Sequence, residues 1–183
     1  MTFQDYLELF EHIVSGKLTQ PPYDETDMLD YTKMNYTRMN RWLKTGQILP
    51  ALNLAIKNIQ QSQVWELITE PWCGDAAHSV PFIYLLSELN PNIHLNIQLR
   101  DSGSEIDQYL YHGAKAIPRL IVRNDRQEDI FIWGPRPHDA QQLFLQLKRD
   151  NTSYEDLKIQ IQHWYNQNKG VMLQEEIMAG LVK

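Results

Sequence analysis

The stretch that decides the fold is Val64–Pro81, which reads VWELITEPWCGDAAHSVP. Its first six residues form a short, largely apolar and β-branched run, which is typical of a buried strand. A helical pattern follows and extends to about Leu89, where the residues NPN stop it. The only cysteine of the chain, Cys73, lies between the two patterns. The stretch therefore predicts a strand, a turn that carries a thiol, and a helix.

Strands and helices alternate in the rest of this region. Residues 93–99 alternate apolar and polar side chains, which predicts a strand with one buried face. A short helix is expected over 104–112, two strands over 118–123 and 129–133, and a further helix around 140–147. This order predicts an α/β fold, with a central mixed sheet, helices on both faces and an antiparallel hairpin at one side.

Residues 1–60 are predicted to be an N-terminal helical extension. Apolar side chains recur at helical spacing over 3–14, behind a cap at Thr2. A second helical stripe is expected to end at Gly46, and Pro50 suits the first position of a third helix. The aromatic residues of the second stripe are expected to pack against the sheet, with a partner-binding face as the alternative: Tyr31, Tyr36 and Trp42.

Residues 149–183 are predicted to be a C-terminal helical extension. Thr152 with Glu155 offers a capping box for one helix, and a last short helix follows. The length suits one domain with a sizeable core. We therefore expect a single domain over 1–183, whose core covers 60–148.

The composition is that of a globular protein in a reducing compartment. Of 183 residues, 43% are hydrophobic and 22% are charged, which are ordinary values for a globular domain. One cysteine excludes a disulfide framework within the chain and any zinc site built from several thiolates. A lone thiol fits a reducing compartment. No metal and no other cofactor is expected.

Charge and hydropathy limit the classes of partner. The net charge of −6 disfavours broad binding to nucleic-acid phosphates. Apolar runs stay short of the ~18 residues that a membrane span needs. The first residues carry charges where a signal peptide needs an apolar block. We therefore expect a cytoplasmic protein that binds neither nucleic acid nor membranes, and its oligomeric state stays open.

The thiol of Cys73 is placed for chemistry. At the start of a helix, unpaired N–H groups and the helix dipole lower a thiol's pKa from ~8.5. Gly74 allows a tight turn and the close approach of another molecule, and Trp72 offers a flat apolar shelf. The alternative is a small buried core residue, as free cysteine often is. The position between Trp72 and Gly74 favours an exposed, functional thiol.

Two motifs resemble the thioredoxin superfamily. WCGDAAHSVP is similar to its active-site stretch, Trp-Cys-Gly-Pro-Cys followed by a helix-kinking proline, with Trp72–Gly74 and Pro81 at matching positions. GAKAIPRLIV resembles the Gly-x-x-x-Ile-Pro-Thr segment, which places Pro118 at the cis-proline that faces the active-site cysteine. The resemblance covers about residues 60–148. It implies a thioredoxin-like fold with extra N-terminal and C-terminal helices.

Within the thioredoxin-like group, the chain looks most like bacterial proteins with a single-cysteine WCGDA motif and an Arg-Asp pair, here Arg100 and Asp101. The resemblance implies that Cys73 is the catalytic residue. The substrate-binding residues that it implies are Trp72, Gly74, Asp75, Ile117, Pro118 and Arg119.

Three departures from the family's pattern bear on function. Ala76 stands where the second, resolving cysteine belongs, so one chain cannot complete a dithiol cycle. Asp75 replaces a proline, and its carboxylate opposes thiolate formation at Cys73, against the helix dipole. Leu67 lies near the position of a buried, proton-relaying aspartate, and strand alternation points the adjacent Glu66 to the other face.

Other polar residues are ambiguous. His78 lies five residues after Cys73, so we expect a solvent-facing or capping histidine rather than a partner of the thiol or a metal ligand. Arg100 and Asp101 end a strand at the edge where α/β sheets bind ligands, and a surface ion pair is an equal alternative. Residues 133–139, WGPRPHD, are expected to be a connecting loop.

The sequence leads to two functional hypotheses. The first is monothiol thiol-disulfide exchange, in which Cys73 attacks a disulfide of a protein or of a low-molecular-weight thiol, and an external thiol releases the adduct. The second is a redox-inactive binding module that uses the groove beside Pro118 for a protein or peptide partner.

Overall fold

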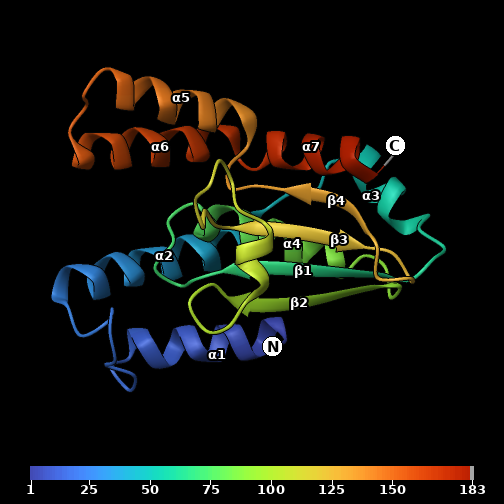
Figure 1. Cartoon of the computed structure of the whole chain (residues 1–183), viewed down its shortest axis with the longest axis horizontal. Helices are drawn as coiled ribbons and strands as arrows, with labels where there is room; N and C mark the ends of the chain where they lie inside the picture. Colours follow the sequence, from blue (N-terminus) through green and yellow to red (C-terminus); the bar gives the residue numbers. More distant parts are fainter. Residues whose placement is uncertain (182–183) are drawn as a thin grey trace.

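A four-stranded mixed sheet forms the centre of the computed structural model, which describes residues 1–181 (Figure 1). The strands are β1 Gln63–Thr69, β2 Ile93–Leu99, β3 Arg119–Arg123 and β4 Asp129–Trp133. Their order along the sheet is β2-β1-β3-β4. Strands β1 and β2 are parallel, whereas β3 runs antiparallel to both β1 and β4. The predicted α/β class and the antiparallel hairpin are confirmed.

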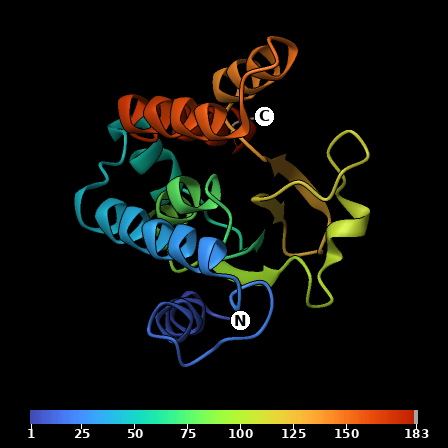
Figure 2. The same ribbon diagram turned by 90° about the vertical axis from the view of Figure 1, so that its left-hand side faces the viewer.

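Helices cover one face of the sheet in two layers (Figure 2). Helix α4 (Ala76–Ser87) lies on the sheet, and α2 (Thr26–Thr45) packs behind it. Helix α4 is enclosed between the two, so nearly all of its side chains are buried. Helix α1 (Phe3–Val14) packs on the edge strand β2, and α7 (Val171–Leu181) packs on β4 and α3 (Pro50–Lys57). Large side chains that this packing buries completely include Tyr6, Phe10, Trp65 and Phe82.

Local signals set the ends of the first three helices. The Asp5 N–H donates to Thr2 Oγ1 (3.1 Å), and the Thr2 N–H donates to the Asp5 carboxylate (2.8 Å), which completes a capping box. Helix α2 ends at Gly46, and Pro50 is the first residue of α3, as predicted. Among residues 1–181, no helix combines the length and the apolar character that crossing a membrane requires.

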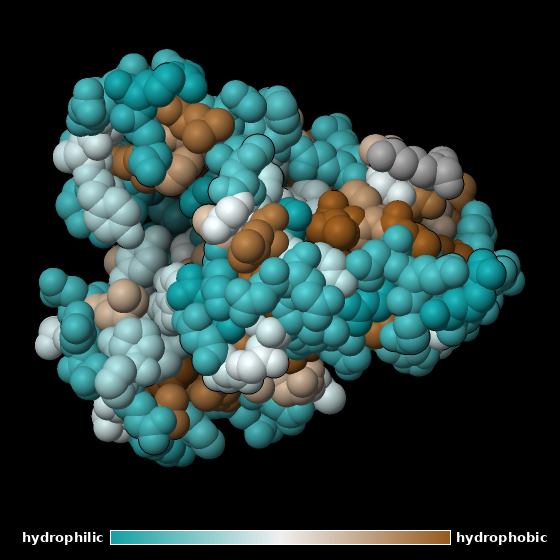
Figure 3. All heavy atoms as spheres, in the orientation of Figure 1, coloured by the Kyte–Doolittle hydropathy of each residue, from teal (hydrophilic) through white to brown (hydrophobic). Residues whose placement is uncertain are grey.

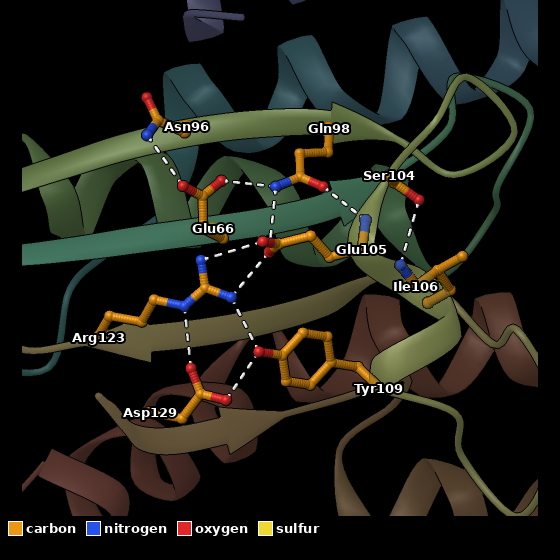
Figure 4. A network of polar contacts seen from close by, with 9 residues as sticks. All are labelled: Glu66, Asn96, Gln98, Ser104, Glu105, Ile106, Tyr109, Arg123 and Asp129. Atoms are coloured by element: carbon orange, nitrogen blue, oxygen red, sulfur yellow. Dashed lines mark hydrogen bonds and ion pairs between the residues drawn. The ribbon is translucent and has the colours of Figure 1, made fainter. Parts of the chain in front are cut away.

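The opposite face of the sheet carries a polar network (Figure 4). Arg123 of β3 donates to Glu105 (2.8 Å) and to Asp129 of β4 (2.9 Å). The Tyr109 hydroxyl also donates to Asp129 (2.7 Å), and Glu66 of β1 accepts bonds from two amides of β2. Glu66 therefore lies on the face away from α4, as strand alternation predicts. These bonds hold the segment after β2 on the sheet.

The helix predicted over 104–112 is wrong in extent. Only the 3-10 turn η1 (Glu105–Gln108) forms, capped by Ser104. Ile106 is buried in this turn, whereas Leu110 is 41% exposed. A longer helix would need a row of apolar side chains to bury, and the η1 turn offers only Ile106. The polar groups on this face of the sheet already have hydrogen-bond partners in the network described above. On the face of the sheet opposite α4, this segment therefore contributes only the short η1 turn.

Helices α5 (His138–Arg149) and α6 (Tyr154–Asn168) form a helical hairpin beyond the sheet (Figure 1). A hollow separates this lobe from the lobe that contains α2 (Figure 3). The predicted cap at Thr152 is wrong, because the Ser153 hydroxyl accepts the Asp156 N–H (3.1 Å) instead. The hairpin has its own apolar cluster, whose buried members are Leu147, Leu157, Ile161 and Tyr165.

Candidate functional site

Cys73 lies in the turn between β1 and α4 and faces the segment before β3. Its N–H donates to the Glu70 carbonyl (3.0 Å), and its Sγ–H donates to the Ile117 carbonyl (3.4 Å). The Ile117–Pro118 peptide bond is cis. The structure thus brings the two sequence motifs together. The expected exposure of the thiol is wrong, because only 7% of Cys73 is exposed.

Burial controls the protonation of this thiol. The pKa of Cys73 is raised to about 12, mainly by removal from water and next by the Asp75 carboxylate. The Ala76 N–H at the start of α4 lowers the pKa, but by less. The sulfur is therefore a protonated thiol at neutral pH. This agrees with its donation to the Ile117 carbonyl.

Asp75 is held in a buried ion pair. Arg136 Nε donates to Asp75 Oδ1 (3.0 Å), and Arg136 Nη2 lies 2.6 Å from Oδ2. The Tyr165 hydroxyl also donates to Oδ1 (3.0 Å). Burial raises the pKa of Asp75, while Arg136 and Tyr165 lower it. Arg136 precedes α5 and Tyr165 belongs to α6, so this carboxylate ties the helical hairpin to the cysteine turn.

His78 is buried in a second polar contact between helices. The Trp42 Nε1–H donates to His78 Nδ1 (2.9 Å), so His78 Nε2 carries the proton and donates to Gln162 Oε1 (2.6 Å). The Tyr165 ring stacks on the imidazole at 4.5 Å. Burial lowers the pKa of His78 to about 3, which keeps the ring neutral.

The predicted position of His78 is therefore wrong. Only 3% of the residue is exposed, and both ring nitrogens bond to groups other than Cys73. Histidine does not activate this thiol. Within residues 1–181, no three His, Cys, Asp or Glu side chains converge on a position that could hold a metal ion.

A cavity of about 340 Å³ opens beside Cys73, between α2 and α6. The Tyr31 hydroxyl lies against Gly74 so closely that a Cβ at Gly74 would collide with it. Cys73 itself packs in the main apolar core, which explains its burial, and its small exposed part borders this cavity. The side chains that give the cavity its chemistry are Tyr31, Trp72, Arg100, Phe144, Tyr154 and Lys158.

The structure divides the substrate-binding residues implied by the resemblance. Four of them line the cavity: Trp72, Gly74, Asp75 and Ile117. Pro118 and Arg119 lie outside its lining. The Arg119 guanidinium donates to the Gly134 carbonyl and lies 5.7 Å from the centre of the Tyr111 ring. Alternation along β3 thus directs Arg119 away from Cys73.

The surface ion pair expected for Arg100 is confirmed, and its role in ligand binding stays a prediction. Its guanidinium donates twice to Asp101, each time over 2.8 Å. It also lines the cavity, 4.6 Å from the centre of the Trp72 ring. The pair is thus a surface ion pair at the edge of the sheet where α/β folds commonly place ligands.

Sequence reasoning missed two residues that complete the site. The sequence places Arg136 in a connecting loop, but it pairs with Asp75. The helical stripe leaves Tyr31 either to packing or to a partner-binding face, and the structure shows that it lines the cavity. Arg136 lies between two prolines, which predicts a restricted backbone at this position. No local sequence pattern indicates that its side chain pairs with Asp75.

Comparison with known proteins identifies the family. The family model described as Thioredoxin matches residues 22–156, which extends beyond 60–148 into α2, α3 and the start of α6. No curated protein matches the sequence. The fold is similar to a crystal structure of an HIV epitope scaffold, with 17% identity and a TM-score of 0.57 over 96% of each chain. A crystal structure of a protein of unknown function from Pseudomonas aeruginosa has 17% identity and a TM-score of 0.49, over 80% of this chain and 87% of that one.

Proposed function

Since the chain belongs to the thioredoxin family, we propose that it uses the family's fold as a redox-inactive binding module, whose ligand occupies the cavity beside Cys73. The observation that carries the proposal is the buried, protonated thiol. Burial raises the pKa of Cys73 far above neutral pH, so the thiolate is a minor species at pH 7. Thiolate is the nucleophile in disulfide exchange, so the site is unsuited to that reaction.

The absence of a second thiol supports the same proposal. Ala76 occupies the position that a resolving cysteine would need, and it is buried against the core. The cavity lining instead offers aromatic rings and cations, which are groups that bind ligands.

Monothiol exchange is the second candidate. The backbone N–H groups of Asp75 and Ala76 lower the pKa of Cys73 and would stabilise a thiolate. In this reaction the Cys73 thiolate forms a bond to one sulfur of a disulfide, and the other sulfur leaves as a thiolate. An external thiol then releases the adduct. The reaction requires the cover over Cys73 to open.

Incubation with oxidised glutathione distinguishes the two candidates. We expect no mass increase on the native protein at pH 7.5, by intact mass spectrometry, because Cys73 is covered and protonated. The matched control is Cys73→Ser combined with Ser62→Cys, which places a single thiol at an exposed position. That control is expected to form the adduct. An adduct on native Cys73 that forms as fast as in the control contradicts the binding module and supports exchange.

A further inference from the structure

We propose that the cavity beside Cys73 binds a small organic carboxylate with a flat, aromatic body. The inference rests on the proposed function and deepens it by naming the chemical class of the ligand. It is carried by cations and aromatic rings that surround one cavity.

The lining is cationic, although the chain has a net charge of −6. Arg100, Lys115, Arg136 and Lys158 line the cavity, against one carboxylate, that of Asp75. Asp75 is already paired with Arg136. The other three cations therefore have no carboxylate within the lining. Such a concentration of positive charge favours an anionic ligand.

The three remaining cations keep the capacity to bind an anion. Their carboxylate partners lie outside the lining, and these partners' side chains are 55%, 71% and 73% exposed. Ion pairs in water contribute little. The side chains of Arg100 and Lys158 are only 26% exposed, so a ligand carboxylate that contacts them interacts more strongly than one in bulk water.

The aromatic rings of the cavity lining favour a ligand with a flat body. The Arg100 guanidinium lies over the Trp72 ring, and Lys158 Nζ lies 5.4 Å from the centre of the Tyr31 ring and 4.8 Å from that of Tyr154. A planar apolar group can stack on these rings while its carboxylate reaches the adjacent cations. The protonated Cys73 adds no negative charge that would repel the ligand.

The volume of the cavity limits the ligand's size. About 340 Å³ lies at the lower end of the range for small-molecule sites. A single ring with a short acidic side chain fits this space. A folded partner would instead meet only the rim formed by α2 and α6.

Binding of an isosteric series tests the inference. The probes are 3-phenylpropionate, 3-phenylpropan-1-ol and 3-phenylpropylamine, which share one body and differ in charge. We expect the carboxylate to bind with a Kd of about 1 mM or below, as measured by chemical shifts in protein NMR spectra. The alcohol is expected to bind about fivefold more weakly and the amine more weakly still. The shifts should include the Trp72 indole N–H.

Two variants locate the site. Lys158→Met and Arg100→Met are each expected to weaken binding of 3-phenylpropionate by about fivefold. The control is Lys57→Met, which removes an exposed cation outside the cavity and is expected to leave the Kd unchanged. Thermal melting confirms that each variant is folded. Equal binding of all three probes, no binding of the carboxylate, or unaltered affinity in both cavity variants overturns the inference.

A fourth probe separates a small acid from a peptide. Tighter binding of the neutral N-acetylphenylalaninamide than of 3-phenylpropionate would assign the cavity to a peptide partner and overturn the inference. None of these outcomes depends on thiol reactivity. The proposed function fails separately, if native Cys73 forms the glutathione adduct as fast as the exposed thiol of the control.

Discussion

Replacing Arg136 with methionine is expected to lower the free energy of unfolding by about 3–5 kcal/mol at pH 7. The substitution keeps an apolar side chain next to Phe144 but removes the guanidinium. Asp75, only 8% exposed, then keeps one strong partner, the Tyr165 hydroxyl. A buried carboxylate without its counter-charge is costly. Chemical denaturation at pH 7 measures the loss.

A second variant shows whether the loss comes from the unpaired charge. Asp75→Asn combined with Arg136→Met removes both charges and is expected to recover most of the stability. Arg126→Met, which removes an exposed arginine from the turn between β3 and β4, serves as the control. If Arg136→Met costs no more than Arg126→Met, the ion pair does not hold the hairpin on the cysteine turn.

The stability of the protein is expected to fall as the pH decreases from 7 to 5, by about 2 kcal/mol from His78 alone. Burial lowers the pKa of His78 to about 3 in the folded state, whereas an unfolded histidine titrates near 6.5. Between these values the unfolded chain binds the proton and the folded protein does not. Stability is therefore lost on acidification and regained as the pH rises through this window.

The His78→Gln variant isolates this effect. Glutamine keeps one donor and one acceptor for Gln162 and Trp42 but does not titrate. Buried carboxylates with raised pKa values, Asp75 and Glu70, act with the opposite sign, and both remain in the variant. Urea unfolding at pH 7 and pH 5 should show a smaller decrease in His78→Gln. The control is His94→Gln, which replaces an exposed histidine and should keep the full decrease. An equal loss of stability from pH 7 to pH 5 in the wild-type protein and in both variants contradicts the assignment to His78.

Much of the fold could be predicted because its signals are local. The cap at Thr2, the stop at Gly46 and the proline at position 50 each act within a few residues, and all three are confirmed. The strands were predicted from short apolar runs. The helix over 104–112 failed because its polar residues bond to the sheet rather than to a helix of their own.

The site could be predicted only in part, because its cover comes from distant segments. The motifs locate Cys73 and Ile117, but the pairing of Asp75 with Arg136 spans 61 residues and that with Tyr165 spans 90. No periodicity indicates that the α5–α6 hairpin folds back over the turn. The burial of the thiol, which raises its pKa, also depends on a long-range contact, since its sulfur meets the Ile117 carbonyl 44 residues away.

The pKa of Cys73 in the native protein decides whether this thiol is buried and unreactive. It is measured as the rate of alkylation by iodoacetamide against pH, with the Cys73→Ser, Ser62→Cys protein as the exposed reference. We expect no titration of native Cys73 below about pH 10 and alkylation far slower than that of the reference. A titration midpoint at or below about 8.5, with alkylation as fast as in the reference, would contradict it.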